Sequence, residues 1–291
     1  MGVRKLLPVK YDVIFRLFFA DERNTEDLIA LLKSILNLSE DDYGEIEIAD
    51  PHLLPEYVGD KYAIIDIKLR TKSRKVIHIE IQLKITESMR ERIVFYDSKL
   101  ITEQMGSGDK YNEIKKVISI VITDEKLIPV SPRYHHRFTF YDPDAGVELT
   151  DIIEIHSIEL QKLPDDTDGT ALYDWAKFIA AETEEELDMI AERNPQVGKA
   201  AVKLREMSAD ERARDLFERR EKALRDIASM MHDSEQKGRL EGRCEGRLEG
   251  RHEQAIEIAR GLLEMAIPID AIIRVTGLSP DEIESLMEEI K

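Results

Sequence analysis

The clearest pattern in the chain is a pair of alternating apolar and polar runs between Lys61 and Leu83, KYAIIDIKLRTKSRKVIHIEIQL. Strict alternation is typical of β-strands, and the short polar stretch between the runs is typical of a turn. One face would carry the apolar residues of both runs, Ala63, Ile65, Ile67, Leu69, Ile77, Ile79, Ile81 and Leu83. The pattern therefore predicts an antiparallel β-hairpin with its turn centred near Ser73.

This register has a chemical consequence, because a hairpin centred on Ser73 pairs Asp66 directly with Glu80 on the polar face. Opposed side chains on adjacent strands have Cβ atoms about 5 Å apart, and like charges at that distance are destabilising. A divalent cation would bind both carboxylates and cancel their repulsion. The alternative is a solvated sheet face on which the two charges splay apart.

Helical and strand patterns alternate on both sides of the hairpin. Helices are predicted over residues 11–20, 24–38, 86–105 and 169–181. Strands are predicted at Val117–Thr123, which reads as buried on both faces, and over residues 134–141 and 152–160. The order predicts an α/β fold with a mixed sheet flanked by helices, over residues 1–185.

Beyond this region the pattern becomes helical, with an extension over residues 186–236 followed by a repeat of period four over residues 237–253. Gly238, Gly242, Gly246 and Gly250 are each followed by Arg, a variable residue and Glu. Each Gly costs a helix about 1 kcal/mol, and like charges recur at the unfavourable spacing of four. The repeat is therefore either an unstructured linker or a helix that self-associates in parallel, with Arg flanks against Glu flanks.

The last segment, residues 254–291, predicts a small helical module. Ser279 is expected to cap the final helix, with Glu282 at the capping-box position. The outline is that of a helix-turn-helix. Five acidic residues in the final helix make a poor surface for the DNA major groove and favour protein–protein packing.

Composition adds limits to this picture. The 291 residues are 42% hydrophobic and 35% charged, a globular composition, with neither a membrane-spanning run nor a signal-peptide pattern. The single cysteine, Cys244, fits a reducing compartment, so we expect a cytoplasmic protein with no membrane partner. The net charge of −18 argues against broad nonspecific binding to nucleic acid. Lys72, Arg74 and Lys75 in the hairpin turn form either a local phosphate-binding patch or ordinary solubilising charge.

Several segments together resemble the Rpn (recombination-promoting nuclease, or putative transposase) family of the PD-(D/E)XK nuclease superfamily. They are YDVIFRLFFAD, DKYAIIDIKLR, the IEIQ tetrad at Ile79–Gln82, RIVFYDSKL with GSGDKY, EIHSIELQKL, WAKF and the Gly/Arg/Glu repeat. They follow the same order as in the family and span nearly the whole chain.

The resemblance implies a restriction-endonuclease-like core that hydrolyses DNA phosphodiesters with Mg²⁺, or another divalent cation such as Mn²⁺ or Ca²⁺. Asp66 and Glu80 would be the metal-ligating acids, and the Ile81 carbonyl an additional ligand. Gln82 occupies the position of the superfamily's motif lysine. A glutamine can orient a group by hydrogen bonding but supplies no positive charge.

Other residues are candidates for supporting roles. Lys68 or Lys61 could supply the missing charge, or Lys68 is an ordinary exposed strand lysine. Arg92 and Tyr96 match the place of a QxxxY element in related nucleases, although Tyr96 also fits the apolar stripe of its helix. Asp12 corresponds to an acid in the first helix, and it either completes the metal site or caps the helix.

Two functions follow as hypotheses. The first is a metal-dependent DNA endonuclease, active in recombination or DNA defence and assembled as a homo-oligomer through its helical tail. The second is a nuclease-fold protein with weak or no catalysis, which acts through the tail as a regulatory or interaction module.

Overall fold

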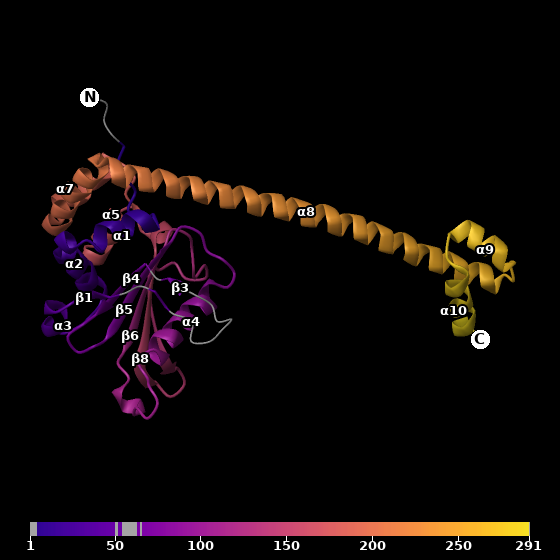
Figure 1. Ribbon diagram of the computed structural model, residues 1–291, viewed down its shortest axis with the longest axis horizontal. Coiled ribbons are helices and arrows are strands. Elements are labelled where there is room, and N and C mark those ends of the chain that lie inside the picture. The colour runs from indigo at the N-terminus through magenta and orange to yellow at the C-terminus, as the bar shows by residue number, and fades with distance from the viewer. Residues whose placement is uncertain (1–4, 50–51, 54–62, 65, 291) are drawn as a thin grey trace. The chain divides into compact units, whose positions relative to one another are not determined.

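The computed structural model describes residues 5–49, 52–53, 63–64 and 66–290, and it divides into two compact units, Met1–Arg220 and Glu221–Lys291 (Figure 1). The first unit therefore includes α6 (Glu184–Arg193) and α7 (Pro195–Ala209), which the sequence placed largely in a helical extension. Both helices contribute buried residues to the main core, among them Leu187, Val197 and Leu204.

The first unit is built on a mixed sheet, which confirms the predicted α/β class. Within the described residues it has six strands in the order β1-β4-β5-β6-β8-β7. The strands are β1 (Glu47–Ala49), β4 (Ile67–Arg70), β5 (Val76–Gln82), β6 (Val117–Thr123), β7 (His135–Asp142) and β8 (Val147–Glu159). Strands β5, β6 and β8 are parallel to one another, and β1, β4 and β7 pair antiparallel with their neighbours.

The predicted hairpin register is confirmed in β4 and β5, where Ile67 pairs with Ile79 and Arg70 with Val76. The first predicted strand is shorter than expected. Ala63–Ile64 forms a separate strand, β3, which pairs with β2 (His52–Leu53) in a second small sheet. A single continuous run from Ala63 to Leu69 was therefore wrong, because the chain bends at Asp66.

Helices cover the two faces of the sheet unequally (Figure 1). One face packs its isoleucines from β5 and β6 against α1 (Asp12–Phe19), α2 (Thr25–Ile35), α5 (Ala171–Ala180) and α7. The other face is covered by α4 (Met89–Thr102), which contributes Met89 and Ile93 to a cluster with Val121. The face that alternation assigned to polar residues is therefore largely buried and not solvated.

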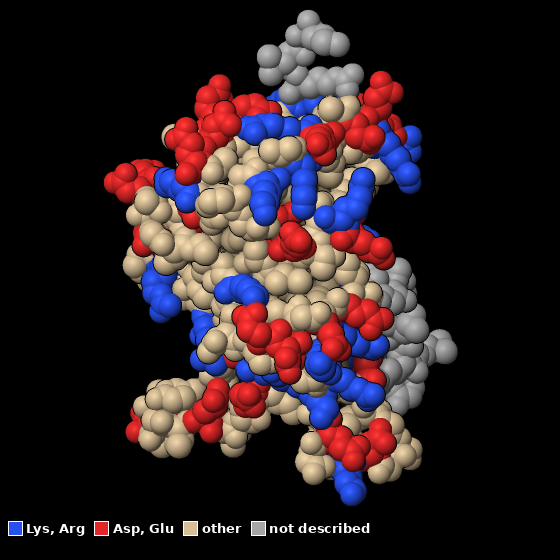
Figure 2. All heavy atoms as spheres, turned by 90° about the vertical axis from the view of Figure 1, so that its left-hand side faces the viewer, with Lys and Arg blue, Asp and Glu red and all other residues tan. Residues whose placement is uncertain are grey.

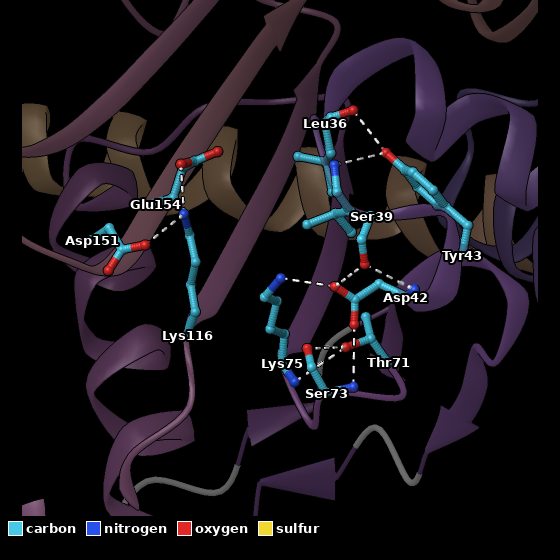
Figure 3. Close-up of polar contacts among 11 residues, drawn as sticks. Leu36, Ser39, Asp42, Tyr43, Thr71, Ser73, Lys75, Lys116, Asp151 and Glu154 are labelled. Atoms are coloured by element: carbon cyan, nitrogen blue, oxygen red, sulfur yellow. Dashed lines mark hydrogen bonds and ion pairs between the residues drawn. The ribbon is translucent and has the colours of Figure 1, made fainter. Parts of the chain in front are cut away.

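The hairpin turn is fixed by one carboxylate from α3 (Glu40–Gly44), as Figure 3 shows. Asp42 accepts hydrogen bonds from the Ser73 amide at 3.1 Å, the Lys75 ammonium at 2.8 Å and the Ser39 hydroxyl at 3.0 Å. Burial opposes ionisation of this carboxyl, but the hydrogen bonds from Lys75 and Ser73 hold the pKa of Asp42 well below its usual range. In the same view Lys116, just before β6, contacts Glu154 of β8 at 2.9 Å.

These contacts bear on the basic patch that the sequence suggested. Lys75 pairs with Asp42, and Lys72 pairs with Glu45 at 2.7 Å. On the face drawn in Figure 2, lysine and arginine side chains are interspersed with aspartate and glutamate, and the described residues there form no continuous basic surface. The patch is thus largely neutralised by neighbouring acids, which favours the solubilising role over phosphate binding.

The second unit contains most of α8 (Glu211–Glu264), followed by α9 (Ile269–Thr276) and α10 (Pro280–Ile290). The Gly/Arg/Glu repeat lies inside α8, so the linker interpretation was wrong. The two short helices and the end of α8 enclose a small core of Ala259, Ile272, Leu278, Ile283 and Leu286. The capping box is confirmed, because the Ser279 amide donates to Glu282 at 2.7 Å and the Glu282 amide to the Ser279 hydroxyl at 3.3 Å.

None of the described helices combines the length and apolar character that crossing a bilayer requires.

The Asp42 contacts give a testable stability prediction. We expect Asp42→Ala to lower the free energy of unfolding by about 1–3 kcal/mol at neutral pH, because it removes the buried carboxylate that accepts hydrogen bonds from Ser39, Ser73 and Lys75. Since the folded-state pKa of Asp42 is lowered, this contribution is present above the ordinary carboxyl pKa and is lost as pH falls through the folded-state value. Urea denaturation at pH 7 and at about pH 2 measures the difference.

Glu45→Ala is the matched control, because its pair with Lys72 is more than half exposed on both sides and should be worth about 0–1 kcal/mol. Equal effects of Asp42→Ala and Glu45→Ala would show that Asp42 does not fix the turn.

Candidate active site

Two carboxylates lie at the open end of the β4–β5 hairpin. Continuing the observed register by one residue beyond Ile67 and Ile79 places Asp66 opposite Glu80. Asp66 accepts a hydrogen bond from the Ile81 amide at 2.8 Å, which holds its carboxylate against β5. Glu80 is only 4% exposed. Among the described residues its polar contact is an ion pair with Arg92 at 3.7 Å, longer than a hydrogen bond.

The electrostatics of this pair are unfavourable for ionisation. Burial raises the pKa of Asp66 to about 6, and the nearby charge of Asp12 adds to the increase while the Ile81 amide opposes it. Burial likewise raises the pKa of Glu80 to about 7, with His78 opposing the shift and the charge of Asp66 adding to it. Two carboxyl groups with raised pKa values side by side are typical of functional sites.

The first helix contributes a third acid near this pair, but its carboxylate already has a partner. Asp12 receives a hydrogen bond from the Arg220 guanidinium at 2.8 Å and one from the Val13 amide at 2.9 Å. Arg220 lies near the start of α8, and its charge and that of Arg16 lower the pKa of Asp66. Asp12 is thus close enough to act on Asp66 electrostatically while it is bound to Arg220.

Helix α4 places an arginine and a tyrosine beside Glu80. The Arg92 guanidinium lies 5.9 Å from the centre of the Tyr96 ring, within the range of a cation–π contact. Burial raises the pKa of Tyr96, and the charge of Glu80 raises it further. Tyr96 also packs against a small core of Val76, Leu100 and Val117, so it serves the apolar interior as well as the site.

Lys68 does not lie free on the strand. It is 5% exposed, and its ammonium pairs with Glu103, just after α4, at 2.7 Å. The interpretation as an exposed lysine was therefore wrong. Its charge is compensated by Glu103, and its strand partner is His78 and not Glu80. Lys61, the other lysine considered, lies outside the described residues.

Behind Glu80 lies a buried polar cluster. His78 is 1% exposed and contacts Asp97 of α4 at 2.8 Å, and Ser119 of β6 hydrogen bonds to both. Nδ1 of His78 and Oδ2 of Asp97 have no partner within the part of the chain that is described. This cluster fixes α4 on the polar face of the sheet.

The donor set suits a hard divalent cation. Asp66 and Glu80 would supply carboxylate oxygens, and Ile81, which follows Glu80 in β5 and donates its amide to Asp66, would add its backbone carbonyl. Mg²⁺ and Mn²⁺ prefer such oxygen ligands, and Mg²⁺ keeps several waters when it binds through one or two carboxylates. Within the described residues no group of three or more His, Cys, Asp or Glu forms a metal cluster, so this site offers two side chains.

Gln82 ends β5 and, by alternation, shares the face of Glu80. The residue is partly exposed, and its backbone carbonyl accepts a hydrogen bond from the backbone amide of Asp124 at 2.9 Å. Gln82 is thus placed beside the carboxylate pair without adding charge to it.

Two protein-family models match the chain. Residues 9–234 match the model of the PD-(D/E)XK nuclease family transposase. The chain belongs to this family. Residues 252–288 match the C-terminal HTH domain of the Rpn/YhgA-like nuclease family. Comparisons with curated proteins and with solved structures gave no match. The resemblance seen in the sequence is confirmed, and the helix-flanked mixed sheet is consistent with a restriction-endonuclease-like fold.

Sequence reasoning missed three contacts around the site. The bond between Asp12 and Arg220 joins residues 208 positions apart and has no local signal. The role of Arg16 beside Asp66 was also missed. Asp97, in contrast, could have been found, because it interrupts the apolar stripe of α4 between Ile93 and Leu100.

The raised pKa values of Asp66 and Glu80 predict that, without metal, the two ionised carboxylates lower the free energy of unfolding in a pH-dependent way. A carboxyl whose folded-state pKa is raised contributes stability that is present below its unfolded value of about 4 and is lost as pH rises through the folded value. We therefore expect Asp66→Asn and Glu80→Gln each to increase the free energy of unfolding at pH 8 by about 1–3 kcal/mol. The gain should shrink at pH 5, where the folded carboxyls are largely protonated.

Urea denaturation in EDTA at the two pH values measures this, with exposed Asp166→Asn as the control. A loss of stability at pH 8 in both variants would contradict the electrostatic account of the pair.

Proposed function

We propose that this protein is a Mg²⁺-dependent endonuclease that hydrolyses phosphodiester bonds in DNA. The observation that carries the proposal is the pair Asp66 and Glu80, two desolvated carboxylates side by side, with the Ile81 amide orienting one of them. Such a pair costs folding stability unless a cation binds it, and family membership makes phosphodiester hydrolysis the most direct use of that cation.

In this mechanism the residues of the chain hold and orient the reacting groups. Asp66 and Glu80, with the Ile81 carbonyl, would hold a divalent cation, and Gln82 would orient the attacking water or the phosphate by hydrogen bonding. The chemistry supplied by a cation there would be polarisation of the phosphate and a lower pKa of the water nucleophile. Asp12 influences the site through its charge beside Asp66.

Cleavage of supercoiled plasmid tests this proposal directly. Purified protein should nick the plasmid with Mg²⁺ or Mn²⁺ and not with EDTA. Asp66→Asn and Glu80→Gln should each lower the rate by at least about 100-fold, because either removes a charge that binds the cation. Ca²⁺ in place of Mg²⁺ shows whether the site tolerates a larger ion.

Asp166→Asn, an exposed loop substitution, controls for the loss of one negative charge. Activity that survives in both site variants would place the chemistry elsewhere. A folded protein that binds metal but cleaves no DNA would favour the second function, a regulatory protein acting through its tail. Two observations support this second function. The basic side chains of the hairpin turn are neutralised by neighbouring acids, and the net charge of the chain is −18.

We further propose that the protein self-associates through α8. Every residue from 225 to 254 is exposed, including the apolar Leu240 and Leu248, and a helix without tertiary packing gains little stability on its own. Added Cβ atoms at Gly238, Gly242, Gly246 and Gly250 would meet no atom of this chain within 4 Å, so the glycines leave room for close approach of a second helix. Parallel pairing sets the Arg flank of one helix against the Glu flank of the other.

Cysteine cross-linking tests this pairing. Gly242→Cys in a Cys244→Ser background places a thiol on the glycine stripe, so a parallel, in-register pair should give a disulfide-linked dimer on mild oxidation at low micromolar protein concentration. The unchanged chain is the control, because Cys244 lies two residues from Gly242, on the opposite side of the helix, where no cross-link is expected. Light scattering of the reduced protein should give a mass above 33.5 kDa. A monomeric mass together with no cross-link would exclude self-association through this helix.

The C-terminal HTH domain is a second place for a partner. Residues 252–288 contain eight acidic residues and two arginines, so this domain cannot bind DNA through a broad electrostatic attraction. We propose that DNA is the substrate of the first unit and that the HTH domain contacts protein, in a pathway of recombination or DNA defence.

A further inference from the structure

Arg92 lies at the edge of the carboxylate pair with unused hydrogen-bond donors. Its Nη2 is 3.7 Å from Oε2 of Glu80, close enough for attraction but too long for a hydrogen bond. The nearest acceptor of that nitrogen is the sulfur of Met89 at 3.0 Å, a weak acceptor. The side chain is 33% exposed, so its outer edge is accessible to a ligand.

The inner edge of the same guanidinium is also unsatisfied. Nε of Arg92 is buried and has no hydrogen-bond partner within the described residues. A buried donor without a partner costs about 1–3 kcal/mol. A guanidinium presents five donors in a planar fork that matches the oxygens of a phosphate. This arrangement is therefore incomplete without an anionic oxygen acceptor.

Two of the other cations near the pair, Lys68 and Arg220, already have carboxylate partners. Lys68 pairs with Glu103 at 2.7 Å, and Arg220 pairs with Asp12 through two of its nitrogens. Arg92, in contrast, is held by a contact with the Tyr96 ring, which fixes its position without using its donors.

Charge balance at the site also favours a cation beside the carboxylate pair. Two ionised carboxylates and one divalent cation sum to zero, so an incoming phosphodiester leaves one uncompensated negative charge in a desolvated position. Gln82, at the end of β5, is neutral. The Arg92 guanidinium, beside Glu80, compensates that charge at short range.

We propose that Arg92 is a phosphate-binding residue of the active site, whose guanidinium donates hydrogen bonds to a nonbridging oxygen of the DNA phosphodiester beside Glu80. This inference rests on the proposed endonuclease function for its substrate class. Contact with phosphate makes Arg92 part of the catalytic machinery, in addition to the acids that bind the cation.

Steady-state cleavage kinetics provide the first test. Arg92→Gln should lower kcat/KM for plasmid cleavage by about 10²–10³-fold, the usual loss for one charge-stabilising donor. Arg92→Lys should recover part of this loss, because it restores the charge without the planar fork. Arg23→Gln removes one charge from an 88% exposed arginine that pairs with Asp21, and it should leave kcat/KM unchanged.

A second readout does not depend on cleavage. DNA binding is measured by fluorescence anisotropy in the Asp66→Asn background, with and without Arg92→Gln, over a series of salt concentrations. Loss of one phosphate contact should weaken binding and reduce the slope of log K against log salt by about 1. Urea denaturation of each variant shows that the comparison is made between folded proteins.

The two readouts separate the possible failures. If wild-type protein cleaves no DNA but Arg92→Gln still reduces the salt slope, the endonuclease function fails and the phosphate contact stands. An unchanged slope together with unchanged kcat/KM in Arg92→Gln would overturn the assignment of Arg92.

Discussion

The first unit depends on how the fold keeps two like charges together away from water. Asp66 and Glu80 repel each other and lose hydration, and both effects favour the protonated forms. Their position is set by the β4–β5 register, since a slip of one residue would move every side chain of β4 to the opposite face. The Asp42 contacts at the turn oppose such a slip. The distant end of the hairpin therefore stabilises the geometry of the carboxylate pair.

The sequence predicted this part of the fold well because strand alternation and turn composition are local signals. Short stretches of sequence are enough to specify three features: the register around Ser73, the fully buried strand Val117–Thr123 and the capping box at Ser279. Local signals could not show what covers each face. Alternation in Val76–Gln82 is compatible with a solvated polar face, but α4 packs over it and buries His78 and Glu80.

The candidate site was predictable only in part, for the same reason. The pairing of Asp66 with Glu80 follows from the register. The contacts of Asp12 with Arg220, and of Lys68 with Glu103, depend on how separate elements meet. The sequence alone suggests that Asp12 and Lys68 are free to act in the site. The structure shows that each already has a partner of opposite charge. A charge in a sequence is therefore weak evidence of a charge available for binding until its neighbours are known.

This distribution of partners also bears on how so acidic a chain would bind the anion that the proposed function requires. Most basic side chains near the hairpin are neutralised by adjacent acids, including Lys72, Lys75 and Lys68. Under the proposed function, long-range attraction of DNA would be weak, and binding would come from a few short-range charges in a desolvated site, where they interact more strongly than at the surface. A cation at the carboxylate pair and the underused guanidinium of Arg92 would supply such charges. Selectivity for a phosphate at this position would then depend on geometry more than on net charge.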